Sequence, residues 1–338
     1  DFFNTKLYTG TGSTQSITGV GFQPDFTWIK NRSTTHDHIL TDAVRGVTKD
    51  IRSNNSDAEA TDSNGLTAFG ADGFTVGSKV NINNNGSNIL SWNWKAGGGQ
   101  GSSNTDGSIN TTYTSVNTTA GFSISSYTGN QTSGATVGHG LGVAPKMILV
   151  KSLSEGHAWR VYHKSVGATK ELYLNLRDTP YTASNIWNDQ EPTSSVFYLG
   201  NNDSGTNKSG VTYVAYCFAE KTGYSKFGTF EGNGSAYPNS PFIYLGFKPK
   251  LFMWKNIDES GSDDNWNMVD STAQQYNIQD AGYLMANDSN YNYSGNTINF
   301  LSNGVKIDVA SAYHNQSGDT YIYMAFGQSI VGSNNVPA

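Results

Sequence analysis

The sequence has little cysteine and no long hydrophobic run. Its one cysteine, Cys217, excludes an intrachain disulfide and a cysteine-based zinc site. Cys217 lies in the apolar run Tyr213–Ala219, so we expect a buried thiol rather than a catalytic one. That run is far shorter than the roughly 18 residues of a membrane span. We therefore expect no membrane insertion.

The sequence is also poor in charge. Charged residues make up 14% of the 338 residues, against about 25% in a typical soluble domain. With 21 Lys and Arg against 27 Asp and Glu, the formal net charge is −6. Such a chain has no basic surface field, so nucleic acid is not an expected partner. Nucleophile elbows, phosphate-binding loops and zinc-protease helices are missing too, so no catalytic residue and no enzyme activity are predicted.

The residues that are abundant favour strands. Aromatic residues reach 12%, glycine occurs 38 times, and Tyr, Phe, Thr and Val outnumber the strong helix formers. The length allows two or three domains. This composition is typical of an all-β protein exposed outside the cell or on the surface of a particle.

Three sets of landmarks recur along the chain at similar spacings. Each set opens on an aromatic–x–Gly triplet and has a proline 16 to 19 residues later, followed by a lysine at the sixth position. Each set ends on an aromatic residue 70 to 77 residues after its proline. The prolines are Pro24, Pro145 and Pro249, the lysines Lys30, Lys151 and Lys255, and the closing residues Trp94, Phe218 and Phe326. Self-similarity of this kind indicates an internal repeat.

The local patterns within each set predict a β-sandwich. The apolar run after each proline, such as Phe26–Ile29, predicts a buried strand. Asp72–Gly73 and Asn303–Gly304 predict tight hairpins with positive φ at both central residues. Short strands separated by turn signals are typical of sandwiches. The sequence therefore predicts an all-β fold of three tandem β-sandwich domains, jelly-roll or lectin-like, at residues 1–98, 99–222 and 223–338, called units 1, 2 and 3 below.

The same patterns predict how the units are filled and joined. We expect the aromatic landmarks to lie in their cores: Trp28, Trp92, Trp94, Phe218, Trp254 and Phe326. The Gly/Ser-rich segment Gly97–Ser103 predicts a flexible linker between units 1 and 2. Units of about 90 residues bury enough surface to fold independently, though only marginally.

Several segments resemble a repeat domain of marine tailed phages, of the cyanophage and pelagiphage kind, found in large virion proteins that are labelled tail fibre or structural. The resembling segments are Gly21–Asn31, Asp72–Gly77, Ser91–Gly97, Tyr213–Gly234 and Thr320–Phe326. The resemblance covers nearly the whole chain. It implies a virion-surface protein, a fibre or spike, with a trimer expected, and it implies no catalytic residues.

Aromatic residues in polar loops are the candidate binding residues. Tyr and Trp rings stack on sugar rings, and Asn and Asp beside them bond sugar hydroxyls. Two segments fit this description, with the residues Trp187, Asn188 and Asp189 in one and Asn290, Tyr291, Asn292 and Tyr293 in the other. Tyr291 and Tyr293 also alternate as strand residues do, so packing at the edge of a sandwich is the competing interpretation.

Acidic loops and one histidine pair supply the candidates for metal binding or hydrolysis. Asp258, Asp263 and Asp264 offer oxygen ligands suited to calcium, without the spacing of an EF-hand, so a structural calcium is possible and no cofactor is predicted. The pair His36 and His38 could place two imidazoles on one face of a strand, but no third ligand is apparent and an exposed loop is the favoured interpretation. Glycan hydrolysis needs two carboxylates about 5–10 Å apart. Asp189 with Glu191 and the cluster around Asp258 are the only local concentrations of acid.

The expected function is that of a non-enzymatic virion-surface appendage, a tail fibre or spike, made in the host cytoplasm. Its loops are expected to contact a host-surface glycan or protein weakly, and oligomerisation multiplies weak contacts. Its other partners would be virion subunits. Two alternatives stay open: a structural capsid decoration or fibre-shaft module, and a polysaccharide depolymerase.

Overall fold

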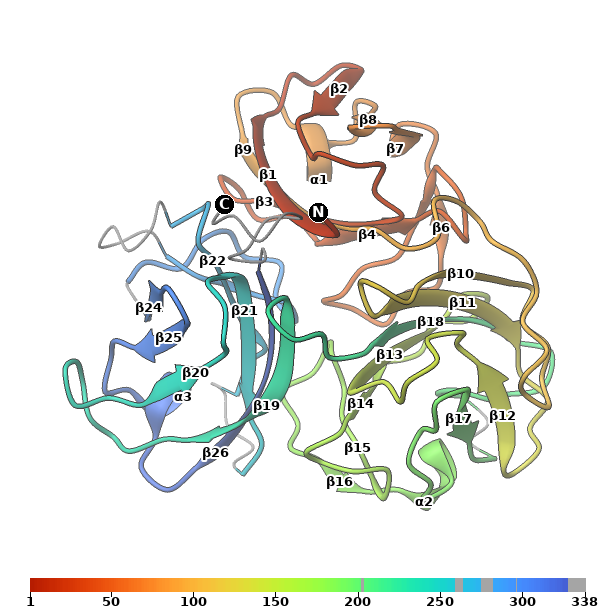
Figure 1. Cartoon of the computed structure of the whole chain (residues 1–338). Coiled ribbons are helices and arrows are strands. Elements are labelled where there is room, and N and C mark those ends of the chain that lie inside the picture. Colours follow the sequence, from red (N-terminus) through yellow and green to blue (C-terminus); the bar gives the residue numbers. More distant parts are fainter. Residues whose placement is uncertain (202–203, 259–263, 275–281, 296, 328–338) are drawn as a thin grey trace.

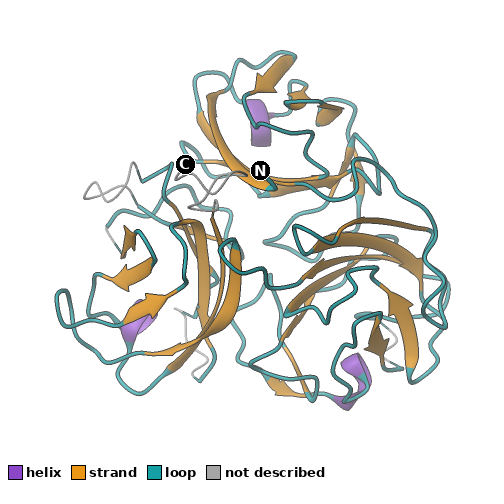
Figure 2. Ribbon diagram, in the orientation of Figure 1, coloured by secondary structure: helices purple, strands orange, loops and turns teal. Residues whose placement is uncertain are grey.

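The computed structural model describes residues 1–338 except 202–203, 259–263, 275–281, 296 and 328–338. The regular secondary structure of the described part is nearly all antiparallel strand, as Figure 2 shows, and this confirms the all-β prediction. Its helices are single turns: α1 (Val80–Asn83), α2 (Ser184–Trp187) and α3 (Ala312–Asn315).

The strands follow the three units in chain order. Unit 1 contains β1 (Phe3–Thr9), β2 (Gln15–Thr18), β3 (Phe26–Asn31), β4 (Ile39–Asp42), β5 (Lys49–Asp50), β6 (Ala60–Thr61), β7 (Leu66–Gly70), β8 (Gly73–Val76) and β9 (Asn88–Trp94). Unit 2 contains β10 (Tyr113–Asn117), β11 (Phe122–Thr128), β12 (Ala135–Gly138), β13 (Met147–Ser152), β14 (Arg160–His163), β15 (Lys170–Glu171), β16 (Tyr181–Thr182), β17 (Val196–Leu199) and β18 (Thr212–Phe218). Unit 3 contains β19 (Ser225–Glu231), β20 (Phe242–Tyr244), β21 (Pro249–Asn256), β22 (Asn267–Asp270), β23 (Leu284–Met285), β24 (Ile298–Leu301), β25 (Gly304–Ile307) and β26 (Thr320–Gly327).

Each unit has one large sheet and one small sheet that covers it on the outside. The large sheets have the strand orders β1-β9-β3-β4, β10-β11-β18-β13-β14 and β19-β26-β21-β22-β23. The small sheets are β2-β8-β7, β12-β17 and β20-β25-β24. The strand after each landmark proline pairs with the closing strand in matching register: Phe26 lies opposite Trp94, Met147 opposite Phe218, and Leu251 opposite Phe326.

The inner strands of the large sheets are buried on both faces. Successive residues of a strand point to opposite faces, so Trp28 packs toward the centre of the molecule while Ile29 packs under the small sheet of unit 1. All six residues of β3 are buried, and the same holds for β13. This double burial explains why these strands are read as continuous apolar runs in the sequence rather than as an alternating pattern.

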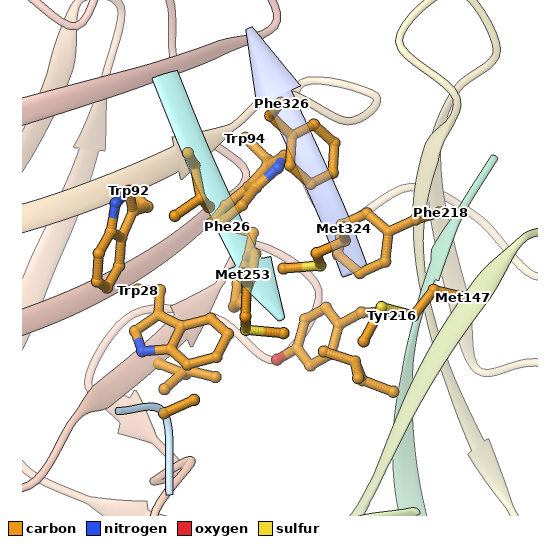
Figure 3. Packing of buried hydrophobic residues seen from close by; sticks show 14 of the residues in the cluster. Phe26, Trp28, Trp92, Trp94, Met147, Tyr216, Phe218, Met253, Met324 and Phe326 are labelled. Carbon is orange, nitrogen blue, oxygen red and sulfur yellow. The ribbon is translucent and has the colours of Figure 1, made fainter. Parts of the chain in front are cut away.

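A central core joins all three units. The long strands of each unit lie nearest the centre of the molecule in Figure 1, and their inner side chains form one cluster. Phe326 of unit 3 illustrates the contacts, since its ring centroid lies 5.6 Å from that of Trp94 in unit 1 and 5.7 Å from that of Phe218 in unit 2 (Figure 3). Phe3, near the start of the chain, lies 5.4 Å from the same ring. The sequence predicted a core within each unit. The shared core was not predicted because it is built from residues that are far apart in the chain.

The predicted hairpins occur, but with different turns. β7 pairs with β8, and Gly70 lies opposite Gly73. The two residues of the turn are therefore Ala71 and Asp72. Neither Asp72 nor Asn303 has positive φ, so the predicted turn type is wrong at both places. Gly73 serves another purpose: a Cβ there would lie 1.9 Å from the carbonyl oxygen of Ile17 on the neighbouring strand. At Gly304 it would lie 2.2 Å from that of Ile243. Both glycines allow the third strand of the small sheet to approach.

The Gly/Ser-rich segment between units 1 and 2 is bound to the protein rather than free. The Asp25 carboxylate accepts hydrogen bonds from the backbone N–H groups of Ala96 at 2.7 Å and Gly98 at 2.9 Å. Ser102 then pairs with Thr114 of β10 through both backbone groups. The prediction of a flexible linker is therefore wrong. The segment is held in place because the buried Asp25 carboxylate accepts hydrogen bonds from its backbone N–H groups.

Candidate binding surfaces and buried polar sites

Each unit buries its landmark lysine at a junction with another unit. Lys151 of unit 2 donates to the carbonyl oxygens of His157 at 2.8 Å and Ser56 of unit 1 at 3.1 Å. The other two lysines make the corresponding contact: Lys30 with Ser289 of unit 3 at 2.7 Å, and Lys255 with Arg177 of unit 2 at 2.9 Å. Burial lowers the pKa of all three lysines to about 8. Because carbonyl oxygens surround each amine, these residues join units rather than act as nucleophiles.

A ring nitrogen repeats the same pattern beside each lysine. The contacts run from His38 to Met285 of unit 3 at 3.1 Å, from Trp159 to Arg52 of unit 1 at 2.8 Å, and from Trp266 to Tyr173 of unit 2 at 2.7 Å, each time to the backbone oxygen. His38 is fully buried, and burial lowers its pKa well below its ordinary value. The exposed loop expected at His38 is therefore wrong, and the imidazole takes the place that tryptophan has in the other two units.

Two buried carboxylates also join units. Asp42 of unit 1 accepts from the Tyr216 hydroxyl of unit 2 at 2.6 Å, and Asp270 of unit 3 accepts from the Trp92 indole of unit 1 at 3.0 Å. Burial raises the pKa of Asp270. The sequence analysis did not single out these carboxylates. The signal available in the sequence was their position, because Asp42 and Asp270 each end the strand that follows a landmark lysine.

Trp187 is placed differently from the prediction. It is 2% exposed and packs edge-on against Tyr162, with ring centroids 6.0 Å apart. Its indole therefore belongs to the core of unit 2, and stacking on a sugar is excluded at this position. Asn188 accepts a hydrogen bond from Ser133 at 2.9 Å, while Asp189 is exposed. The polar neighbours in sequence suggested a loop, but α2 turns Ile186 and Trp187 inward.

The second predicted segment lies at the junction of units 1 and 3. Tyr291 is 51% exposed. Tyr293 is half-buried, stacks on Tyr283 at 5.3 Å, and donates to Asp288 at 2.6 Å. Asn290 donates to the Tyr293 hydroxyl at 2.9 Å, and Asn292 accepts from Arg32 of unit 1 at 3.2 Å. The packing interpretation therefore holds for Tyr293. Of the two tyrosines in this segment, Tyr291 is the one whose ring is exposed to solvent.

The acidic candidates do not come together as a metal site. Asp258 accepts from the backbone N–H of Thr320 at 2.6 Å, and Asp264 is 5% exposed, with its backbone oxygen bonded to Lys255. Asp263 lies outside the described residues. Within the described ranges, no three His, Cys, Asp or Glu side chains are grouped in a way that could hold a metal ion.

Glu191 of the acidic pair is held by hydrogen bonds that favour its ionised form. Glu191 accepts from the Tyr162 hydroxyl and from Lys164 at 3.0 Å. Burial alone would raise the pKa of Glu191, but these hydrogen bonds lower it overall. A general acid needs a raised pKa, so Glu191 is tuned in the opposite direction.

The outer face of unit 3 shows three exposed aromatic rings, a surface called the aromatic face below. Tyr237 is 61%, Phe242 45% and Tyr244 59% exposed. Phe242 and Tyr244 are outward residues of β20, which is an edge strand of the small sheet. Lys306 lies opposite Phe242 and places its amine 5.8 Å from the centre of the Tyr237 ring. The three rings therefore form one strip. The sequence analysis missed it because Phe242 and Tyr244 alternate with Ile243 in the ordinary pattern of a half-buried strand.

The corresponding faces of the other units are not aromatic at these positions of the sheet. In unit 1, the outward residues of β2 are Ser16, where unit 3 has Phe242, and Thr18, where it has Tyr244. In unit 2, the matching residues of β12 are Thr136 and Gly138. The aromatic face therefore distinguishes unit 3 from two otherwise similar units.

Comparisons with known proteins give a family but no activity. No curated protein and no solved structure matches the chain. No helix of the described chain has the length and hydrophobicity that crossing a bilayer requires. One family description, Domain of unknown function (DUF7483), matches residues 1–329 and so spans all three units. Since this match covers nearly the whole sequence, the chain belongs to the DUF7483 family.

Proposed function

We propose that this chain is a non-enzymatic adhesion module of a phage virion surface, a tail fibre or spike, and that the aromatic face of unit 3 contacts a host-surface glycan. The observation that supports this most strongly is the exposure of Tyr237, Phe242 and Tyr244 in one strip. Virion location and trimeric assembly rest on the sequence resemblance alone. In this proposal, the three units are tandem copies of one β-sandwich.

The chemistry of the strip suits sugars. Carbohydrate rings stack on exposed aromatic faces, and rigid aromatic side chains lose little conformational entropy on binding. The rings of Tyr237 and Tyr244 each lie near a lysine amine, Lys306 at 5.8 Å and Lys226 at 5.2 Å. Such cation–π contacts restrain the rings before a ligand arrives, and repetition of the strip in an oligomer would raise its avidity.

The test compares glycan binding by three proteins. The wild type and the variant Tyr237→Ser/Phe242→Thr/Tyr244→Ser are applied to a glycan array and to host cells. The control is Tyr181→Ser, which removes a ring that is 45% exposed in unit 2. We expect the triple variant to lose binding while Tyr181→Ser retains it.

Two results would contradict the proposal. Retained binding by the triple variant would remove the aromatic face from consideration. Absence of any glycan or cell binding by the assembled wild type, together with stable binding of the same face to another virion subunit, would favour the capsid-decoration or fibre-shaft alternative.

A further inference from the structure

We propose that a pocket at the junction of units 1 and 2, called the junction pocket below, binds one neutral sugar ring. The pocket has a volume of about 260 Å³ and lies between β10 and β11 of unit 2 and the segment that follows β4 in unit 1. The side chains that give it its chemistry are Glu59, Gln100, Thr112, Tyr113, Ser126 and Thr212. It is separate from the aromatic face, which belongs to unit 3.

A fixed carboxylate provides the hydroxyl acceptor. Arg45, whose side chain is 2% exposed, lies 2.5 Å from Asp42 and 3.1 Å from Glu59. Glu59 is itself 17% exposed and so reaches the pocket with one side held by the guanidinium. Arg45 and Lys49, whose amine lies 3.5 Å from Glu59, balance the charges of Asp42 and Glu59. Because this wall carries no net charge, it favours a neutral ligand that donates hydrogen bonds.

The walls supply hydroxyl groups and the half-buried ring of Tyr113. The side-chain hydroxyls of Thr112, Ser126 and Thr212 form no hydrogen bond with another residue of the described chain. Tyr113 is half-buried and packs against the central core, which fixes its ring at the side of the pocket. Ligand sites combine an apolar wall with a few convergent polar groups in this way, and sugar hydroxyls are the natural partners of unoccupied hydroxyls.

The equivalent junction of units 1 and 3 shows why this pocket is special. There the cavity measures only about 10 Å³, room for about one water molecule. The walls differ in two ways. Thr112 and Tyr113 of the open pocket lie in or just before β10, which has no counterpart in the four-stranded large sheet of unit 1. The residue two positions after the landmark lysine is also different, Leu153 in unit 2 and Arg32 in unit 1. Arg32 lines the small cavity and donates to Asn292 across the junction. One junction is therefore filled by an arginine and the other is open.

The experiment measures binding of free neutral hexoses and N-acetylhexosamines by ligand-observed NMR. The pocket is blocked by Thr212→Trp at an exposed position at the start of β18. The matched control is Asn88→Trp, which alters the exposed first residue of the corresponding strand β9. We expect at least one sugar to bind the wild type with a Kd of about 1 mM. Thr212→Trp should weaken that binding by at least about tenfold, and Asn88→Trp should leave it unchanged.

A second variant separates pocket loss from misfolding. Thr112→Val removes the hydroxyl of an exposed lining residue and should also weaken binding, with a melting temperature equal to that of the wild type. The triple variant of the aromatic face should bind the free sugar normally, so failure of glycan adhesion and failure of the junction pocket give different results. No sugar bound to the wild type, or equal binding by the wild type and Thr212→Trp, would overturn the inference.

Discussion

The interior of the molecule repeats from unit to unit, whereas its outer faces do not. Lys30, Lys151 and Lys255 each donate to a backbone oxygen of a neighbouring unit. On the outside, Ser16 and Thr136 occupy the positions that correspond to Phe242 in unit 3. The lysine contact recurs in all three units, so assembly of the units explains it. The Phe242 ring occurs in unit 3 alone, so assembly does not explain it. The comparison therefore separates scaffold from surface and directs the search for function to the places where the units differ.

The largest expected effect is on the shared core. Phe326→Ala removes a ring that contacts residues of units 1 and 2, and large-to-small changes of this kind cost about 3–5 kcal/mol. We expect the whole chain, not unit 3 alone, to lose that free energy of unfolding in chemical denaturation. A loss confined to a spectroscopic probe in unit 3 would break the comparison, because it would show that the units have separate interiors.

A smaller loss is expected at the buried lysines. Lys151→Met leaves the carbonyl oxygens of Ser56 and His157 without this donor, and an unsatisfied buried group costs about 1–3 kcal/mol. Lys49→Met is the control, since the Lys49 side chain is 38% exposed and contacts Glu59 at 3.5 Å and the Thr61 hydroxyl at 2.7 Å within its own unit. That control should change the free energy of unfolding by at most about 1 kcal/mol. Equal effects of the two substitutions would mean that the repeated lysines do not join units.

The same lysines give the unfolding free energy a pH dependence. Their folded pKa of about 8 lies below the ordinary value of 10.5, so between these values the unfolded chain binds more protons than the folded one. Stability must therefore rise with pH in this window. Buried tyrosines such as Tyr216, whose pKa is raised by burial, act oppositely above their ordinary value of about 10. Denaturation should thus show stability increasing from pH ~8 to ~9.5, with a shallower slope in Lys151→Met; a flat or falling curve would contradict the burial of these amines.

The smallest stability effect is expected at the aromatic face. Tyr237→Ser/Phe242→Thr/Tyr244→Ser alters exposed rings, and changes at exposed positions usually alter stability by within about 0.5 kcal/mol each. Thermal melting compared with Phe326→Ala checks this, with glycan binding as the second measurement. A large drop in melting temperature would show that the face is part of the scaffold.

The sequence predicted the parts of the fold that depend on local pattern. The landmark aromatics Trp28, Trp92, Trp94, Phe218, Trp254 and Phe326 are all buried, because apolar runs after a proline report strands covered on both faces. The hairpin at Gly73 was located from the Asp72–Gly73 pair, although its turn type was wrong. The contact of Phe3 with Phe326 has no local signal, since it depends on how three sheets come together.

The candidate site was predicted less well. Trp187 was assigned to the surface because Asn188 and Asp189 follow it, yet a single helical turn places it in the core. Phe242 and Tyr244 were overlooked because their alternation with Ile243 is the ordinary pattern of a half-buried strand. Only the comparison with Ser16 and Thr18 of unit 1 shows that these rings are unusual. The junction pocket could not be predicted at all, since its walls come from two units.

The central claim is that one shared core makes the three units a single cooperative body. Differential scanning calorimetry of the intact chain tests it directly, because the calorimetric enthalpy is compared with the van't Hoff enthalpy of the same transition. We predict one transition in which the two enthalpies agree. Three separable transitions, or a calorimetric enthalpy about three times the van't Hoff value, would show that the units unfold independently and would contradict the shared core.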